Sequence, residues 1–332
     1  MFDSLLNAIA RHSRRIPQWL IEGLFAAAAN IAWLARAAGV RQLERNLRHV
    51  LQSSHPQRPV TAHELRAMSR KGMRSYFQYF AEAMTVDARS EEQLRARVRG
   101  EGEGVPMLQE AARHGQSSPM ALGHQGNWDY AGLWGSFEVA PVLTVAERLS
   151  NEQLLETFIE IRKKLGITVL LTGSKHLTAQ LEERMRIDAP VVAPLLADRD
   201  LGRNGEFVEA FGSVIRVARG PATLAYDSGR PLYVVNVYRE RLDGKRRDQA
   251  ATRYGYVCEI GAPIDVTPFL SMEREEAIHA ISQEWVRIWS QGIVRHPEDW
   301  HMLQPIFIDD LDFSRLKNVP EHVLEMVGKS SR

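Results

Sequence analysis

The chain has 332 residues, 44% of them hydrophobic and 25% charged, which is the composition of an ordinary globular protein with enough length for a substantial core. Lys and Arg number 42 and Asp and Glu 41, so the chain lacks the overall positive field that non-specific nucleic-acid binding needs, and we expect no nucleic-acid partner. The one cysteine, Cys258, excludes an internal disulfide and a multi-cysteine zinc site, and it fits a reducing, cytosolic setting.

The first 50 residues combine positive charge with the most apolar segment of the chain. They carry seven arginines against three acidic residues, and residues 16–38 read IPQWLIEGLFAAAANIAWLARAA. Glu22, Asn30 and Arg36 interrupt this stretch, which makes it marginal as a spanning helix of roughly 20 apolar residues. The pattern favours a helix lying in the headgroup zone of anionic lipid, with a buried core helix and a true span as alternatives. The side chains suited to the lipid contact are Trp19, Leu20, Leu24, Phe25, Ile31, Trp33 and Leu34.

The pattern along the chain changes from helical to alternating near residue 119. Before it we predict helices at 41–60, 61–84 and near 104–115, the second opened by Thr61 and Glu64 at the spacing of a capping box. After it, short apolar runs alternate with helices of 10–16 residues, which indicates a mainly parallel sheet covered on both faces. The predicted strands are 119–123, 141–147, 167–171 and 190–198, then two antiparallel strands at 231–240 and 253–264, and a late amphipathic helix ends before Pro297.

These elements predict an α/β fold with a central, mainly parallel or mixed sheet flanked by helices. We assign residues 1–60 to basic and apolar helices for membrane association, 61–310 to the α/β domain and 311–332 to a C-terminal tail. No repeat, low-complexity tract or linker rich in Pro, Gly or Ser divides the chain further.

The residues with the clearest chemical pattern are His124 and Asp129 in PMALGHQGNWDYAGLW. His124 follows a predicted buried strand and Asp129 falls in the first turn of the next helix, at the edge of an open sheet where active sites form. Asn127 is a plausible N-cap, and the loop between them lets the carboxylate turn back to the imidazole. The alternative is an ordinary histidine at a strand end, satisfied by a helix cap.

A His–Asp pair without a neighbouring nucleophile implies that the substrate brings its own. The carboxylate fixes the tautomer, and the other ring nitrogen removes a proton from a bound hydroxyl. The chain contains no G-x-S-x-G sequence, which disfavours a serine acyl-enzyme. We therefore expect direct acyl transfer, with no metal and no cofactor. Backbone N–H groups near Asn127 and Trp128 are the candidate oxyanion donors.

Further polar residues are predicted at the same edge of the sheet. Carboxylates there suit sugar hydroxyls and arginines suit phosphate, although a solvated turn with local ion pairs is an alternative. Residues 74–84, RSYFQYFAEAM, are a candidate lining for an acyl channel or else a normal core helix. The candidate substrate-binding residues are Glu147, Arg148, Arg162, Asp198, Arg199, Asp200 and Arg203.

Four blocks in order carry a family resemblance: ALGHQGNWD, LLADRDLGRNG, ARGPATLAYDSGRPLYVV and HPEDWHMLQPIF. Together they resemble the lipid A acyltransferase-like superfamily with its H-x4-D motif, within the glycerol-phosphate-acyltransferase-like folds, and are most similar to the bacterial phosphatidylinositol mannoside acyltransferases. The likeness extends to about residue 309. It implies a long-chain acyl-CoA donor, a mannose hydroxyl of a phosphoinositol mannoside as acceptor, His124 as general base and Asp129 as its partner.

The resemblance also implies a peripheral enzyme on the cytoplasmic face of the inner (plasma) membrane, in contact with an anionic surface. Two alternatives stay open. One is an acyltransferase acting on another glycolipid such as a lipid A precursor, with an acyl carrier protein as a possible donor. The other is a non-catalytic lipid-binding protein of the same fold.

Overall fold

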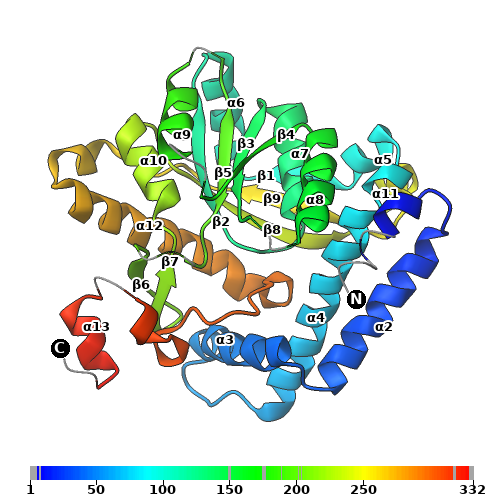
Figure 1. Cartoon of the computed structure of the whole chain (residues 1–332), viewed down its shortest axis with the longest axis horizontal. Helices are drawn as coiled ribbons and strands as arrows, with labels where there is room; N and C mark the ends of the chain where they lie inside the picture. Colours follow the sequence, from blue (N-terminus) through cyan, green and yellow to red (C-terminus); the bar gives the residue numbers. More distant parts are fainter. Residues whose placement is uncertain are drawn as a thin grey trace.

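The centre of the molecule is a seven-stranded mixed sheet with helices on both faces (Figure 1). The computed structural model describes residues 6, 9–148, 151–173, 177–187, 189–200, 202, 204–316 and 319–328. The strand order is β1-β9-β8-β2-β5-β3-β4, and β1 and β9 run opposite to the other five. The strands are β1 (Val98–Glu101), β2 (Ser118–Leu122), β3 (Val142–Ala146), β4 (Ile167–Leu171), β5 (Val192–Leu196), β8 (Tyr233–Arg241) and β9 (Tyr254–Ile260).

Alternation along the central strands assigns one helical layer to each face of the sheet. Met120 and Leu122 of β2 pack with α6 (Gly104–Arg113), α7 (Trp128–Glu138) and α8 (Glu152–Lys164), whereas Ala121 packs with α10 (Gly220–Ser228) and α12 (Arg274–Arg295). Successive side chains of a strand point to opposite faces, so a strand covered on both sides is apolar throughout. The helix α9 (Leu177–Arg186) joins the second layer. The predicted fold class is confirmed.

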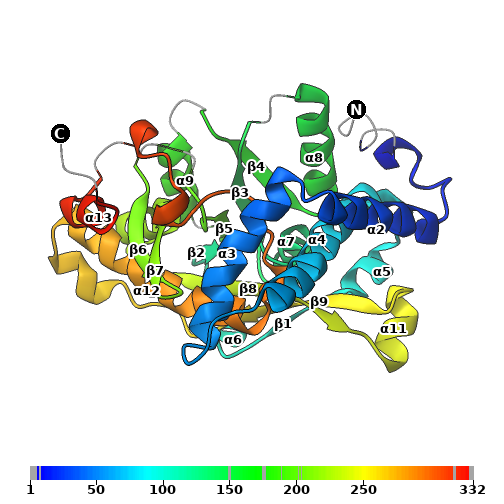
Figure 2. The same ribbon diagram turned by 90° about the horizontal axis from the view of Figure 1, so that it is seen from below.

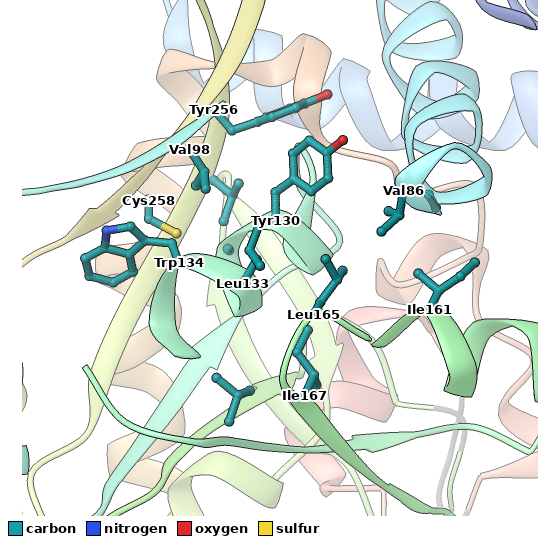
Figure 3. Packing of buried hydrophobic residues seen from close by; sticks show 14 of the residues in the cluster. Val86, Val98, Tyr130, Leu133, Trp134, Ile161, Leu165, Ile167, Tyr256 and Cys258 are labelled. Atoms are coloured by element: carbon teal, nitrogen blue, oxygen red, sulfur yellow. The ribbon is translucent and has the colours of Figure 1, made fainter. Parts of the chain in front are cut away.

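The core beneath α7 is drawn in Figure 3. Leu133 and Trp134 of α7 lie among side chains from the sheet and from α8, including Ile167 and Cys258. The hydroxyls of Tyr130 and Tyr256 point toward the same region near the N-terminal end of α7. The close packing of α7 on the sheet fixes the loop that precedes this helix, and that loop contains His124.

Three helices of the N-terminal part form a separate layer at one end of the molecule (Figures 1 and 2). They are α2 (Gln18–Leu34), α3 (Ala38–Ser54) and α4 (Ala62–Met84). α2 packs along α4 through the buried residues Ile21, Phe25 and Ala29. The predicted capping box is confirmed, because Thr61 Oγ1 accepts from the N–H of Glu64 and the Glu64 carboxylate accepts from the N–H of Thr61.

The outer side of α2 exposes a row of large apolar side chains. Trp19 is 73% exposed, Ile31 66% and Leu34 68%, and Leu20 and Leu24 are about half exposed. Two residues predicted for this face are not on it: Phe25 is buried, and Trp33 is half-buried with its indole N–H bonded to Ser69 and Arg66. Among the described residues no single helix has the length and apolar character to cross a bilayer, and α2 and α3 meet that test only together, across a bend of 78°.

The remaining elements are short. They include a hairpin of β6 (Glu206–Ala210) and β7 (Ser213–Val217). Neither this hairpin nor the strand β1 was predicted from the sequence. Val323 of α13 (Glu321–Met326) is fully buried against this hairpin. The other short helices are α5 (Glu91–Ala96), α11 (Gly244–Ala250) and the single turns η1 (Val86–Ala88), η2 (Thr267–Ser271), η3 (Pro297–Asp299), η4 (Ile308–Asp310) and η5 (Phe313–Arg315).

Candidate active site

The ends of two neighbouring strands bring His124 and Asp198 together. β2 and β5 are parallel with Leu122 opposite Leu196, and His124 and Asp198 each follow two residues later. The imidazole Nδ1 lies 2.6 Å from Asp198 Oδ1, and the backbone N–H of His124 donates to Asp198 Oδ2 at 2.9 Å. The carboxylate therefore holds the ring with a proton on Nδ1, which leaves the lone pair on Nε2.

Asp198 is held as a carboxylate in a fully buried position. Burial by itself would raise its pKa, but attraction to His124 and hydrogen bonds from His124 and Trp300 outweigh burial, and the pKa lies below the usual value. Trp300 Nε1–H donates to Oδ2 at 2.9 Å. Both oxygens of Asp198 accept from protein donors and Asp198 is not among the described residues that line the cavity, so the structure places it against His124 rather than at the position predicted for a ligand of sugar hydroxyls.

Asp129 does not hold the imidazole, and this part of the sequence prediction is wrong. Its Oδ1 accepts from Arg162 Nε at 2.8 Å and its Oδ2 accepts from the Tyr79 hydroxyl at 2.9 Å. The first turn of α7 aims Asp129 toward α8 and α4, away from β5. Burial opposes the charge of Arg162, but Asp129 and Tyr79 outweigh it and the pKa of Arg162 is raised. Asp129 is therefore a buried anion paired with a cation.

The loop between His124 and α7 is fixed by its own side chains and by one glycine. Asn127 is the N-cap, as predicted, since its Oδ1 accepts from the N–H of Tyr130 at 3.0 Å, and its amide donates to Glu82 at 2.8 Å. Gly126 has φ +59°, and a Cβ there would lie 2.6 Å from the carbonyl oxygen of Val237. Only glycine fits this close approach at a positive φ.

A segment late in the chain closes the site from the other side. The backbone N–H of His301 donates to the carbonyl oxygen of His124 at 2.7 Å, and Trp300 reaches Asp198 as described. The ring of Trp128 lies edge-on to His124, with centroids 5.4 Å apart, and stacks over Tyr79 at 3.9 Å. The sequence analysis assigned no role at the site to Trp300, His301 or Tyr79. Tyr79 belongs to the helix proposed as an acyl lining, and the other two belong to the terminal block HPEDWHMLQPIF.

The site opens into a cavity of about 1150 Å³. His124, Asp129, Arg162, Tyr79 and His301 all line it. Polar groups therefore converge at one place on a wall that is otherwise largely apolar, which is the usual make-up of a small-molecule site.

The cavity reaches both faces of the sheet because β3 and β5 separate. The one paired position of these two described strands is Val142 with Val192. Further along, Pro194 has no N–H to offer, and the Thr144 hydroxyl donates to its carbonyl oxygen at 2.6 Å instead. Leu195 and Leu196, which face opposite sides of the sheet, both line the cavity.

The cavity therefore has two arms, one on each face of the sheet. The first lies between the sheet and α7 and α8, and apart from Asp129, Thr144 and Arg162 its described lining is apolar: Leu122, Gly132, Val142, Leu154, Leu155, Phe158 and Ile167. The second lies beside α9 and α10, and its lining mixes leucines with Thr178, Arg219, Thr223 and Arg274. An acyl chain suits the first arm, because burying apolar surface against charged groups would cost their hydration.

Of the other predicted site residues, Glu147, Arg199 and Asp200 lie at the rim of the cavity. Arg199 lines the cavity and lies 3.6 Å from Glu147, and it also contacts Gln304. Asp200 lines it as well, in an ion pair with Arg216 at 2.6 Å. Arg148 is exposed and is not among the described residues of the lining. Arg203 lies outside the described residues.

Cys258 does not take part in this arrangement. It is buried in β9, and burial raises the pKa of its thiol to about 12, which leaves it protonated and inert at neutral pH. The groups gathered at the cavity are thus a base with its carboxylate and a buried Arg–Asp pair.

A histidine oriented by a carboxylate, beside a deep and largely apolar cavity at the edge of an α/β sheet, is an arrangement suited to an enzyme that removes a proton from a substrate hydroxyl. The sequence comparisons make the class specific. Residues 1–308 match the family model of the bacterial lipid A biosynthesis acyltransferases, and the chain belongs to that family. It is therefore an acyltransferase of the class that modifies glycolipids.

Curated relatives cover nearly the whole chain. The chain is similar to a phosphatidylinositol mannoside acyltransferase of Mycolicibacterium smegmatis, with 34% identity over 304 residues that span 91% of this chain and 90% of that protein. A protein of the same name from Mycobacterium tuberculosis is 32% identical over 91% of this chain and 87% of its own length. The predicted family resemblance is confirmed.

Proposed function

We propose that this protein transfers a long-chain acyl group from acyl-CoA to a mannose hydroxyl of a phosphatidylinositol mannoside. The relatives that match most of the chain are named phosphatidylinositol mannoside acyltransferases, which supports the acceptor class. The observation that carries the chemistry is the His124–Asp198 pair, 2.6 Å apart, at the mouth of the cavity.

The proposed reaction needs one base and no acyl-enzyme. Nε2 of His124 removes the proton of the acceptor hydroxyl as its oxygen attacks the thioester carbonyl. The C–O bond forms and the C–S bond breaks, and the imidazolium returns its proton to the leaving thiolate. Asp198 stabilises the imidazolium through the Nδ1–H bond, as carboxylates do for catalytic histidines. The step balances without a metal or a cofactor, and neither is part of the proposal.

Asp129 and Arg162 supply a polar wall for the acceptor. Arg162 is 14% exposed in its side chain and Asp129 is 3% exposed, and both line the cavity beside His124. Nε of Arg162 is bonded to Asp129, and a guanidinium carries further N–H donors beyond Nε. We assign this pair to the sugar or its phosphate, with Glu147, Arg199 and Asp200 at the outer rim, and the start of α7 near Trp128 to the oxyanion.

The proposal includes a peripheral position on the cytoplasmic face of the inner (plasma) membrane. The exposed apolar row of α2 and the arginines of residues 1–50 suit an anionic lipid surface. A membrane-bound acceptor would then enter the site without leaving its bilayer.

The test is an acyl-transfer assay with purified protein. Radiolabelled palmitoyl-CoA or palmitoyl acyl carrier protein is offered with a phosphatidylinositol mannoside or with a lipid A precursor. We expect transfer from the CoA thioester to the mannoside, and loss of turnover in His124→Ala with an unchanged circular dichroism spectrum. Transfer to the lipid A precursor only, or most activity retained in His124→Ala, would overturn the proposal.

A further inference from the structure

The first arm of the cavity runs the full length of β3. Both the first residue of this strand, Val142, and the last, Ala146, line it, which corresponds to about 13 Å at roughly 3.3 Å per residue. His124 and Asp198 lie at the carboxyl edge of the sheet, so Val142 and its neighbour Ile167, the first residue of β4, lie at the far end. Both are buried at 5% exposure or less while still lining the cavity.

A close contact between α7 and β4 lies at that end. A Cβ placed on Gly132 would lie 2.5 Å from Cδ1 of Ile167 and 3.1 Å from its Cγ1. The helix therefore approaches the strand as closely as a residue without a side chain permits, and the Ile167 Cδ1 methyl fills the place that a methyl on residue 132 would take. Figure 3 shows Ile167 in this position beneath α7, beside Leu133 and Leu165.

A second, small cavity of about 30 Å³ lies between α7 and the strands β2, β5 and β8. It shares Leu122, Trp128, Gly132, Val142 and Pro194 with the large cavity, and Gly135, one turn further along α7, lines only the small one. Of the two residues in the contact, Gly132 therefore borders both spaces, whereas Ile167 lines the large cavity only.

We infer that Gly132 and Ile167 form the end wall of the acyl site and set the longest acyl chain that the enzyme accepts. The inference rests on the proposed acyl transfer and adds its specificity determinant. The first arm takes the chain because its described lining is apolar beyond the polar group of Asp129, Thr144 and Arg162, whereas Arg219 and Arg274 line the second. One methyl group at such a wall discriminates between chain lengths by about tenfold or more in kcat/KM.

Two substitutions move the wall in opposite directions. Gly132→Ala adds a methyl that displaces Ile167 Cδ1 toward the chain, so the ratio of kcat/KM for stearoyl-CoA to that for lauroyl-CoA should fall by about tenfold. Ile167→Val removes Cδ1 and should raise the same ratio. The double variant exchanges one methyl for the other and should return the ratio toward the wild-type value.

Matched controls separate specificity from stability. Gly135→Ala lies on the same helix, and its Cβ would make ordinary contacts of 3.4 Å and 3.6 Å with Val142 and Val192, so the chain-length ratio should not change. Leu224→Phe narrows the second arm and should also leave the ratio unchanged. A general loss of stability would lower kcat/KM for all acyl-CoA lengths and would not reverse in the double variant.

The outcomes are decisive in each direction. Opposite shifts in the two single variants with compensation in the double variant support the end wall. An unchanged ratio in Gly132→Ala and Ile167→Val, or a shift in Leu224→Phe instead, overturns it while wild-type transfer still stands. Absence of transfer by the wild-type protein with every acyl-CoA would refute the proposed function itself.

Discussion

A buried chain of hydrogen bonds next to the site keeps one histidine neutral. The Ser75 hydroxyl donates to Asp299 Oδ1 at 2.6 Å, and His301 Nε2 lies 3.0 Å from the same Ser75 oxygen. Because Ser75 has already given its one proton to Asp299, it accepts from His301 Nε2–H. Burial lowers the pKa of His301 to about 3, with a smaller contribution from His124.

This histidine makes the protein sensitive to acid. The unfolded chain binds a proton at this residue below about pH 6.5, whereas the folded protein does not until about pH 3, so stability falls as the pH drops through that window. Between pH 7 and pH 5 the loss from this residue is about 2 kcal/mol. We expect urea unfolding of His301→Gln, whose amide still reaches toward Ser75, to lose that much less over the same interval. An equal loss in both proteins would contradict the assignment.

The sequence placed His124 at a strand end but did not identify the carboxylate that lies against it, and the reason is physical. His124 at a strand end is a local feature, and the sequence located it. The identity of its partner depends on which strand lies beside β2, and that strand is β5, whose paired residues come 74 positions later in the chain. Asp129 was nearer in sequence, but the helix that begins at Trp128 carries it toward Arg162.

At the scale of elements, the local sequence was sufficient to predict helix caps and those strands that have an apolar run. The capping box of α4, the N-cap of α7 and the buried strands β2 to β5 were all predicted near their observed bounds. The strand β1 and the hairpin of β6 and β7 were missed, because their short, charged sequences such as VRGE and EFVEA have no apolar run. The separation of β3 from β5 at Pro194 could not be predicted either, because the sequence does not say which strands are neighbours in the sheet.

The capping box makes a prediction at this scale. Thr61→Ala removes the acceptor for the Glu64 N–H at the start of α4, and we expect a loss of about 1 kcal/mol in the free energy of unfolding. Thr61→Ser keeps the hydroxyl and should stay within a few tenths of a kcal/mol of the wild type. Urea denaturation measures both, and equal stability of the Ala and Ser variants would show that the cap contributes nothing.

At the scale of the whole molecule, the α2 face is the candidate contact with lipid. Leu24 and Ile31 are exposed on the side of α2 that faces away from α4, while Ile21 and Phe25 hold the helix to the protein. Leu24→Glu with Ile31→Glu should abolish co-sedimentation with vesicles containing anionic phospholipid, because it removes apolar area and adds repulsion.

A control on another exposed leucine tests the location of that contact. Leu270 lies in η2 and is 45% exposed, so Leu270→Glu is matched to the single variant Leu24→Glu, which replaces a leucine of 49% exposure with the same acid. We expect its vesicle binding to equal that of the wild type. Binding that survives the α2 substitutions, or is lost equally in Leu270→Glu, would refute α2 as the lipid contact.

The central claim is that His124 and Asp198 act as one unit on the acceptor proton, and a double-mutant cycle on kcat tests it most directly. His124→Ala and Asp198→Asn should each lower kcat for acyl transfer by about a hundredfold or more, and the double variant should be no slower than His124→Ala. Near wild-type turnover in Asp198→Asn, or losses that multiply in the double variant, would contradict the account.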